Sequence, residues 1–212
     1  MNYSSETINK LYYGDRLINI SVTNGGGGGG DVPSNLSQWT YDNDGNIKSI
    51  TYTAETIPAS AYTYTKLTDV TIGNSVTSIG RNAFYRCDSL TSLTIGNSVT
   101  TISGSAFSYC IGLTSVTIPN SVRNIGEYAF QTCSNLTSVT ILDSVTSIGS
   151  SAFRYCSRLA SVTVLAATPP TLGSSVFNNT NNCPIYVPSA SVDVYKSATN
   201  WSTYASRIQA IP

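Results

Sequence analysis

Apolar residues recur at one fixed spacing through the middle of the chain. A 23-residue pattern, L-x-x-V/L-x-I-x-x-x-V-x-x-I-x-x-x-A-F-x-x-C-x-x, begins at Leu67, Leu90, Leu113 and Leu136, and a copy that begins at Leu159 departs from it. Burying the apolar side chains of one copy yields roughly 12 to 24 kcal/mol. Ordering its backbone costs about 23 to 46 kcal/mol. One copy therefore cannot fold alone, and the pattern predicts a solenoid of stacked copies that share a core.

Each copy is expected to contribute one strand. Segments such as 90–95 and 136–141 alternate apolar and hydroxyl side chains, which is typical of a half-buried strand. Since all copies run in the same direction, their strands should stack in parallel about 4.8 Å apart. The Ala-Phe-x-x-Cys segment predicts a short helical or 3₁₀ return, with its Phe behind the sheet. Phe84, Phe107, Phe130 and Phe153 should then lie above one another.

Runs of the form I-G-x-x-A-F-x-x-C-x-x-L extend from Ile79 to Leu90, from Ile125 to Leu136 and from Ile148 to Leu159. They resemble the BspA-like class of leucine-rich repeat proteins. This resemblance implies a leucine-rich repeat solenoid that is capped at both ends. It also implies a binding or adhesion module, and it brings no catalytic residues with it.

The remaining sequence suggests five segments. Residues 1–24 predict a β-hairpin that turns at Gly14-Asp15 and serves as an anchor, and the glycines 25–30 form a linker. A packed polyglycine strand inside an assembly is the alternative for that tract. Residues 31–66 predict an N-terminal cap, with a hairpin that turns at Asp44-Gly45, followed by a shortened repeat. Residues 67–158 contain four repeats, and residues 159–212 contain a degenerate repeat and a C-terminal cap. Within that cap we expect a strand at 185–187 and a covering helix or two between 190 and 208.

Composition argues against several functions. The chain has no histidine, which removes the usual general base and the commonest metal ligand, so we expect no enzyme and no cofactor. Eleven basic and eleven acidic residues give a net charge of zero and provide no basic stripe for nucleic acid. No run of about 18 apolar residues predicts a membrane span.

Cysteine spacing ranks three hypotheses. Four cysteines recur every 23 residues and should form one straight column: Cys87, Cys110, Cys133 and Cys156. Such a row cannot place four sulfurs around one zinc ion, and its Cβ atoms would sit slightly too far apart for disulfides. Buried small apolar side chains are the favoured interpretation. The segment Asp42-Asn-Asp44-Gly45 begins like a calcium loop, but a hairpin turn is the better interpretation.

Two sets of outward positions are candidate binding surfaces. The first is a column of strand residues: Asp69, Thr71, Ser92, Thr94, Ser115, Thr117, Ser138, Thr140, Ser161 and Thr163. The second lies beside the cysteines: Tyr85, Arg86, Tyr109, Arg154 and Tyr155. Hydroxyl side chains also simply favour exposed strands, and variation in the second set is neutral unless it serves recognition. Tyr and Arg are enriched where proteins bind partners.

Two functional hypotheses remain open. The solenoid is a non-enzymatic module that recognises a surface glycan or protein, or it is a structural protein that residues 1–30 anchor in a larger assembly. No secretory signal is visible in the first twenty residues. Residues 8–20 weakly resemble the hairpins that open virion proteins of gut bacteriophages. We therefore expect the protein on a phage virion or on a bacterial cell surface.

Overall fold

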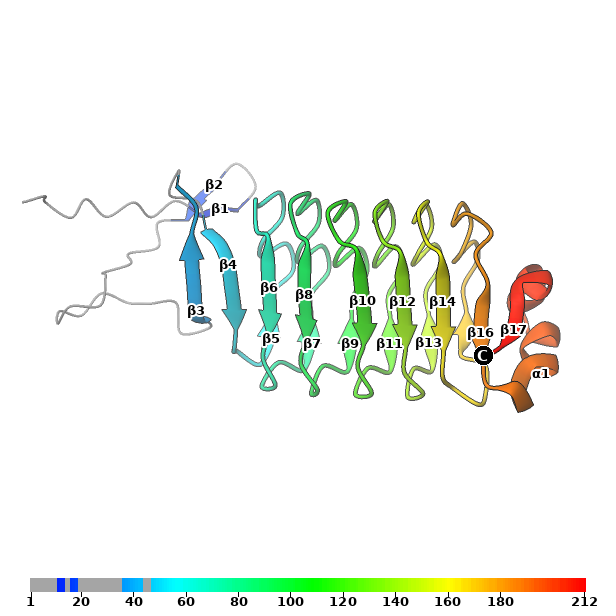
Figure 1. The fold of residues 1–212 in the computed structure, drawn as a ribbon. Coiled ribbons are helices and arrows are strands. Elements are labelled where there is room, and N and C mark those ends of the chain that lie inside the picture. The colour runs from blue at the N-terminus through cyan, green and yellow to red at the C-terminus, as the bar shows by residue number, and fades with distance from the viewer. Residues whose placement is uncertain (1–10, 14–15, 19–35, 44–46) are drawn as a thin grey trace, which may run out of the picture.

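The computed structural model describes residues 11–13, 16–18, 36–43 and 47–212. Parallel strands follow one another side by side along the molecule (Figure 1). The long strands of the repeats are β6 (Asp69–Ile72), β8 (Ser92–Ile95), β10 (Ser115–Ile118), β12 (Ser138–Ile141) and β14 (Ser161–Val164), followed by β16 (Ile185–Val187) and β17 (Ile208–Ala210). This arrangement confirms the predicted solenoid of stacked parallel strands.

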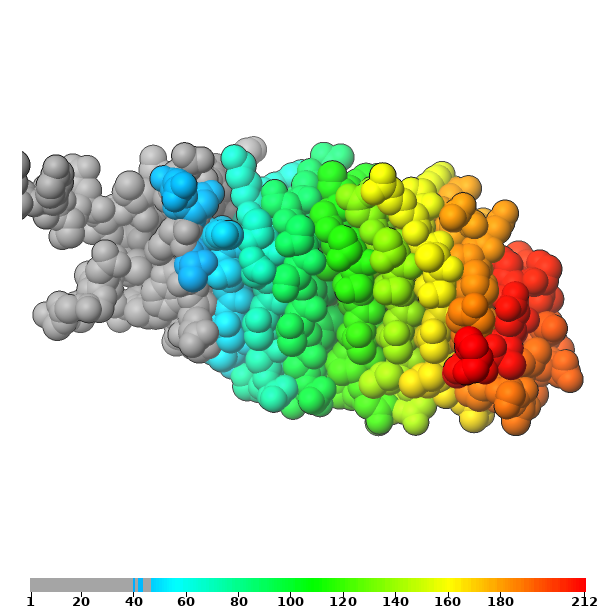
Figure 2. Space-filling model, in the orientation of Figure 1, coloured from blue at the N-terminus to red at the C-terminus, as the bar shows by residue number. Residues whose placement is uncertain are grey.

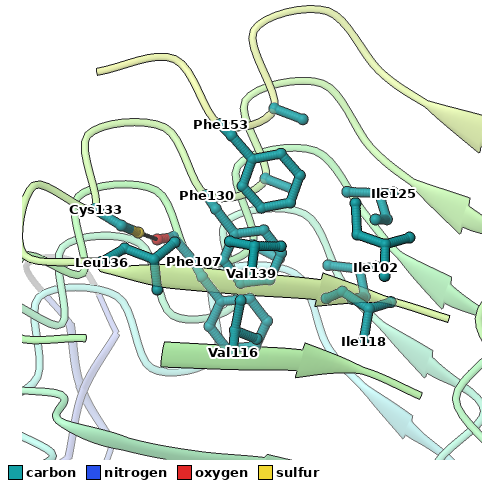
Figure 3. Packing of buried hydrophobic residues seen from close by; sticks show 14 of the residues in the cluster. Ile102, Phe107, Val116, Ile118, Ile125, Phe130, Cys133, Leu136, Val139 and Phe153 are labelled. Atoms are coloured by element: carbon teal, nitrogen blue, oxygen red, sulfur yellow. Dashed lines mark hydrogen bonds between the residues drawn. The ribbon is translucent and has the colours of Figure 1, made fainter. Parts of the chain in front are cut away.

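The stacking keeps equivalent residues in register. Ser115 pairs with Ser138 and Ser138 with Ser161, so each strand lies one repeat of sequence beyond its neighbour. Phe130 stacks on Phe107 at 5.2 Å and on Phe153 at 5.3 Å between ring centroids, with the rings nearly parallel. Figure 3 shows these three rings one behind another, with valines of the long strands on one side and isoleucines on another. The predicted column of buried phenylalanines is therefore confirmed.

Each repeat also contributes a second strand, where one was expected. These strands are two residues long: β5 (Thr56–Ile57), β7 (Ser78–Ile79), β9 (Thr101–Ile102), β11 (Asn124–Ile125), β13 (Ser147–Ile148) and β15 (Thr171–Leu172). They form one continuous six-stranded parallel sheet, with their Ile or Leu buried. A strand this short shows no alternation in the sequence, which is why the pattern did not reveal it.

The returns contain no helix, in contrast to the expected helical or 3₁₀ form. Each is a run of turns with at least two residues at positive φ, for example Tyr128 at 58° and Thr132 at 59°. Bonds such as Ala129 N–H to the Gly126 carbonyl close these turns, while Phe130 N–H donates to the Ala152 carbonyl of the next repeat at 2.8 Å. The residues at positive φ direct alternate N–H groups along the axis of the solenoid, toward the next repeat. The returns therefore form a ladder of hydrogen bonds between repeats instead of helices, in addition to the ladders of the long-strand and short-strand sheets.

This third ladder donates in one direction along the stack, whereas the long-strand sheet bonds in both directions, since Val162 N–H in β14 also donates forward, to the Pro184 carbonyl. Gly173 N–H donates back to the Ile148 carbonyl of the preceding repeat, whereas Phe153 N–H donates forward to the Val176 carbonyl of the following one. The last repeat has no following repeat to bond, so it leaves both carbonyls, such as that of Pro170, and N–H groups, such as that of Phe177, to be paired by other means. Each set needs a different kind of partner, since unpaired buried backbone groups are costly.

The C-terminal cap supplies both kinds of partner. It contains η1 (Ser189–Ser191), α1 (Val192–Ser197) and η2 (Trp201–Arg207), in agreement with the expected helices. The Trp201 Nε1–H donates to the Pro170 carbonyl at 2.8 Å, and the Phe177 N–H donates to the Tyr204 hydroxyl at 3.1 Å. The strand expected at 185–187 is β16, but β17, which pairs with it in parallel, was not anticipated.

Two antiparallel pairs precede the repeats. β1 (Leu11–Tyr13) pairs with β2 (Arg16–Ile18), and β3 (Leu36–Tyr41) pairs with β4 (Ile47–Tyr52), in agreement with two expected hairpins. β4 then joins β6 in parallel and connects this hairpin to the solenoid. Gly14-Asp15, the glycine tract 25–30 and Asp44-Gly45 lie outside the described residues, so the linker and the rejected calcium loop stay untested.

One junction between repeats differs from the others. No backbone hydrogen bond joins segment 91–96 to segment 114–119, and the long-strand sheet divides between β8 and β10. Pro119 has no N–H, whereas Leu165 at the equivalent position donates to the Ile141 carbonyl at 2.9 Å. The β9 to β11 pairing continues across the same junction. We call this gap in the long-strand sheet the seam; Leu93 beside it is only partly buried.

Candidate functional site

The strand column lies as the sequence indicated, but the seam divides it. Figure 2 views the molecule from the side of the long strands. Thr71 pairs with Thr94 before the seam, and Thr117 pairs with Thr140 and Thr163 after it. The column is partly to fully exposed, and its other members follow the same register: Asp69 and Ser92, then Ser115, Ser138 and Ser161. It is a regular hydroxyl surface in two parts.

The return side brings three tyrosines and an arginine together. Tyr64, Tyr85 and Tyr109 form an edge-to-face series with ring centroids 5.6 and 5.7 Å apart. The Arg86 Cζ lies 5.9 Å from the centre of the Tyr64 ring and 5.0 Å from that of Tyr109. Tyr64 is 63% exposed and Arg86 is exposed. We call these four residues the tyrosine–arginine cluster.

The backbone under this cluster is fixed. Tyr64, Arg86 and Tyr109 have φ of 60°, 57° and 62°, the conformation of the second turn in each return. Their N–H groups donate to carbonyls of the next repeat, at 2.8 Å from Tyr64 to Tyr85, 2.9 Å from Arg86 to Ser108 and 2.8 Å from Tyr109 to Gln131. The ladder of the returns therefore presents these side chains outward from a hydrogen-bonded frame.

Arg154 and Tyr155 form a separate pair. The Arg154 guanidinium lies 4.7 Å from the centre of the Tyr155 ring and donates from Nη2 to its hydroxyl at 3.1 Å. In the intervening repeat, Gln131 and Thr132 hold the positions of Arg154 and Tyr155, so no aromatic side chain connects this pair to Tyr109. The second candidate surface is thus two patches rather than one.

Sequence reasoning missed Tyr64 as a member of the cluster. Tyr64 follows Tyr62 by two residues, as Arg86 follows Phe84 and Tyr109 follows Phe107. Tyr62 stacks on Phe84 at 5.2 Å and takes the place of the phenylalanine in the shortened repeat. Since this correspondence was visible in the sequence, aligning the shortened repeat one step further would have found Tyr64.

The four cysteines of the column are buried, as is Cys183 outside it, and all five thiols are free. Each thiol of the column donates to a carbonyl of the preceding repeat: Cys87 to Tyr62 at 3.1 Å, Cys110 to Phe84 and Cys133 to Phe107 at 3.2 Å, and Cys156 to Phe130 at 3.3 Å. Burial raises the pKa of Cys156 to about 12 and that of Cys133 well above its usual range. These thiols are structural donors as well as small apolar groups.

Within the described part of the chain, no three His, Cys, Asp or Glu side chains are grouped so that they could hold a metal ion. No helix there is both long and apolar enough to cross a bilayer. The features that stand out on the surface are therefore the two hydroxyl segments, the tyrosine–arginine cluster and the Arg154–Tyr155 pair.

Short repeats, parallel sheets and terminal caps define the chain as a solenoid repeat protein. The family model described as "BspA type Leucine rich repeat region" matches residues 55–185 in six copies. The chain belongs to this family of leucine-rich repeat proteins. No curated protein matches the chain.

Solved structures with the same fold come from several bacteria. A leucine-rich repeat protein of T. pallidum matches with a TM-score of 0.57 and 24% identity, over 74% of this chain and 81% of that one. A leucine-rich cell surface protein of Faecalibacterium prausnitzii A2-165 has a TM-score of 0.50 and 27% identity, over 62% of this chain and 38% of that one. The pneumococcal vaccine antigen PcpA has a TM-score of 0.58 and 19% identity, over 80% and 41%. The match spans less than half the length of the last two.

Proposed function

We propose that this chain is a non-enzymatic adhesion module that binds a surface glycan or protein through its return side. The observation that carries the proposal is the tyrosine–arginine cluster, in which one exposed ring, two half-buried rings and an exposed guanidinium are held on a hydrogen-bonded backbone. Tyr and Arg are the residues that most often dominate binding energy at protein interfaces. A rigid presentation lowers the entropy lost on binding.

The proposed setting of this module is a cell surface. The F. prausnitzii relative is described as a cell surface protein, which supports a surface location for a chain of the same fold. A phage virion or a purely structural assembly through residues 1–30 remains the alternative. In that case the solenoid would decorate a particle without binding a ligand.

Arrays of glycans and of extracellular proteins test the proposal directly. The native chain should bind at least one class of probe, and a variant with Tyr64, Tyr85 and Tyr109 all changed to Ala should lose most of that binding. Tyr128→Ala is the matched control, because Tyr128 is an exposed tyrosine at positive φ in a return outside the cluster.

A variant with Thr71, Thr94 and Thr117 changed to Ala separates the two surfaces. If it loses binding while the triple tyrosine variant keeps it, the strand side is the binding surface and the return side is not. No binding to either array would favour the structural assembly hypothesis.

A further inference from the structure

The described arginine side chains differ in what holds them. Four of them hydrogen-bond within the chain: Arg123 to the Asn120 and Ser144 carbonyls, Arg154 to Tyr155, Arg158 to Asn135, and Arg207 to the C-terminal cap. Arg81 and Arg86 make no hydrogen bond or ion pair through their side chains with any described residue, and of these two only Arg86 contacts aromatic rings, those of Tyr64 and Tyr109. Its guanidinium donors are therefore available to a ligand.

The position of Arg86 in the stack fixes how those donors are presented. Tyr64 belongs to the preceding repeat and Tyr109 to the following one, so the guanidinium lies between two rings of the same column. Both ring centres lie within 6 Å of the Arg86 Cζ, which is the range of cation–π contacts. Arg86 is exposed, and the N–H groups on the rim of a guanidinium are the part that binds oxygen pairs.

We infer that Arg86 binds a carboxylate of a protein partner, an Asp or Glu side chain in an acidic segment; this inference rests on the proposed function. A planar fork matches the two oxygens of a carboxylate in a bidentate, charge-assisted pair. The flanking rings hold the fork before binding, which reduces the ordering that a flexible Arg would need. The adjacent Tyr85 ring adds the aromatic contact typical of protein interfaces.

The electrostatics of the chain make this a local effect. The formal net charge is zero, so attraction of an acidic partner cannot come from an overall positive field. It must come from charges near the cluster, and the contribution of Arg86 should depend on the geometry of its guanidinium, not on its charge alone. Arg86→Lys tests that distinction, because lysine keeps the charge and loses the planar fork.

Immobilised poly-L-glutamate is the probe, with poly-L-glutamine as the uncharged reference, and biolayer interferometry is the measurement. The native chain should bind poly-L-glutamate and not poly-L-glutamine. Arg86→Lys should bind at least about tenfold more weakly, which corresponds to about 1.4 kcal/mol. Arg158→Lys is the matched control, since Arg158 is exposed and already donates to Asn135 at 3.1 Å; it should bind like the native chain.

Three results would overturn the inference. The first is no binding of poly-L-glutamate by the native chain, and the second is equal affinity in Arg86→Lys and native protein. The third is binding of polygalacturonate without poly-L-glutamate, which would assign the same guanidinium to acidic glycans. If the arrays show binding that the triple tyrosine variant loses but Arg86→Lys keeps, the proposed function stands and only the role of Arg86 fails.

Discussion

Removal of one ring from the phenylalanine column provides the sharpest test of the stacked core. Phe130 has no exposed surface and lies between Phe107 and Phe153 at 5.2 and 5.3 Å, with interplanar angles of 11° and 1°. Phe130→Ala removes a buried ring and both of these contacts. Substitutions of this kind cost about 3 to 5 kcal/mol when the surroundings cannot collapse. Collapse is restricted here, because three hydrogen-bonded ladders join this repeat to the following one, and the β9–β11 pairing and the return ladder still join it to the preceding one across the seam.

The expected loss in Phe130→Ala is large relative to the total free energy of unfolding. Domains of this size are commonly stable by about 5 to 15 kcal/mol, so Phe130→Ala should remove roughly a fifth or more of the unfolding free energy. Phe130 lies in the middle of a one-dimensional array, and stability in such an array is a sum of repeat and interface terms. Weakening two adjacent interfaces should therefore also broaden the urea transition or divide it in two.

Urea unfolding followed by circular dichroism measures both effects. Tyr128→Ala in the same return is the matched control, because Tyr128 is 38% exposed and should change the free energy by less than about 0.5 kcal/mol. A loss below about 1 kcal/mol in Phe130→Ala, with a single sharp transition, would refute the stacked ring column as a principal source of stability.

Three further predictions address other parts of the stack. Pro119→Leu should restore an N–H donor facing the Ile95 carbonyl and increase hydrogen-exchange protection around β10. The net change in stability should be small, because the new hydrogen bond and the lost rigidity of proline offset each other. Unchanged exchange would reject proline as the cause of the seam. Gly126→Ala should destabilise the fold far more than Gly104→Ala. A Cβ at Gly126 would lie 2.5 Å from the Gly104 nitrogen, whereas a Cβ at Gly104 would approach no atom closer than 3.3 Å. Equal melting temperatures for the two variants would contradict this prediction. The pKa of Cys156 is about 12 in the folded chain and about 8.5 in the unfolded chain, so the stability that the protonated thiol contributes is complete below pH 8.5 and is lost as pH rises toward 12. Cys156→Ala should therefore lose less stability between pH 8 and 11 than the native protein. Identical losses would contradict the effect of burial on this thiol.

The sequence identified some members of the candidate site but not which of them contact one another. Tyr85, Arg86 and Tyr109 could be recognised as outward positions because each follows a buried phenylalanine at a fixed offset. Which of them touch depends on the side chains that neighbouring repeats place at adjacent positions. Tyr64 completes the cluster, whereas Thr132 leaves Tyr155 outside it.

The sequence by itself determined the repeat period, the long strands, the ring column and the burial of the cysteines, because each follows from one apolar pattern that is repeated in register. Only the tertiary structure decided the two-residue strands, the turn-built returns and the seam at Pro119. Those features come from hydrogen bonds between residues a full repeat apart. The direction of these bonds is set only when the copies stack. Stacking also leaves the last repeat in need of a donor, which Trp201 provides, and of an acceptor, which the Tyr204 hydroxyl provides.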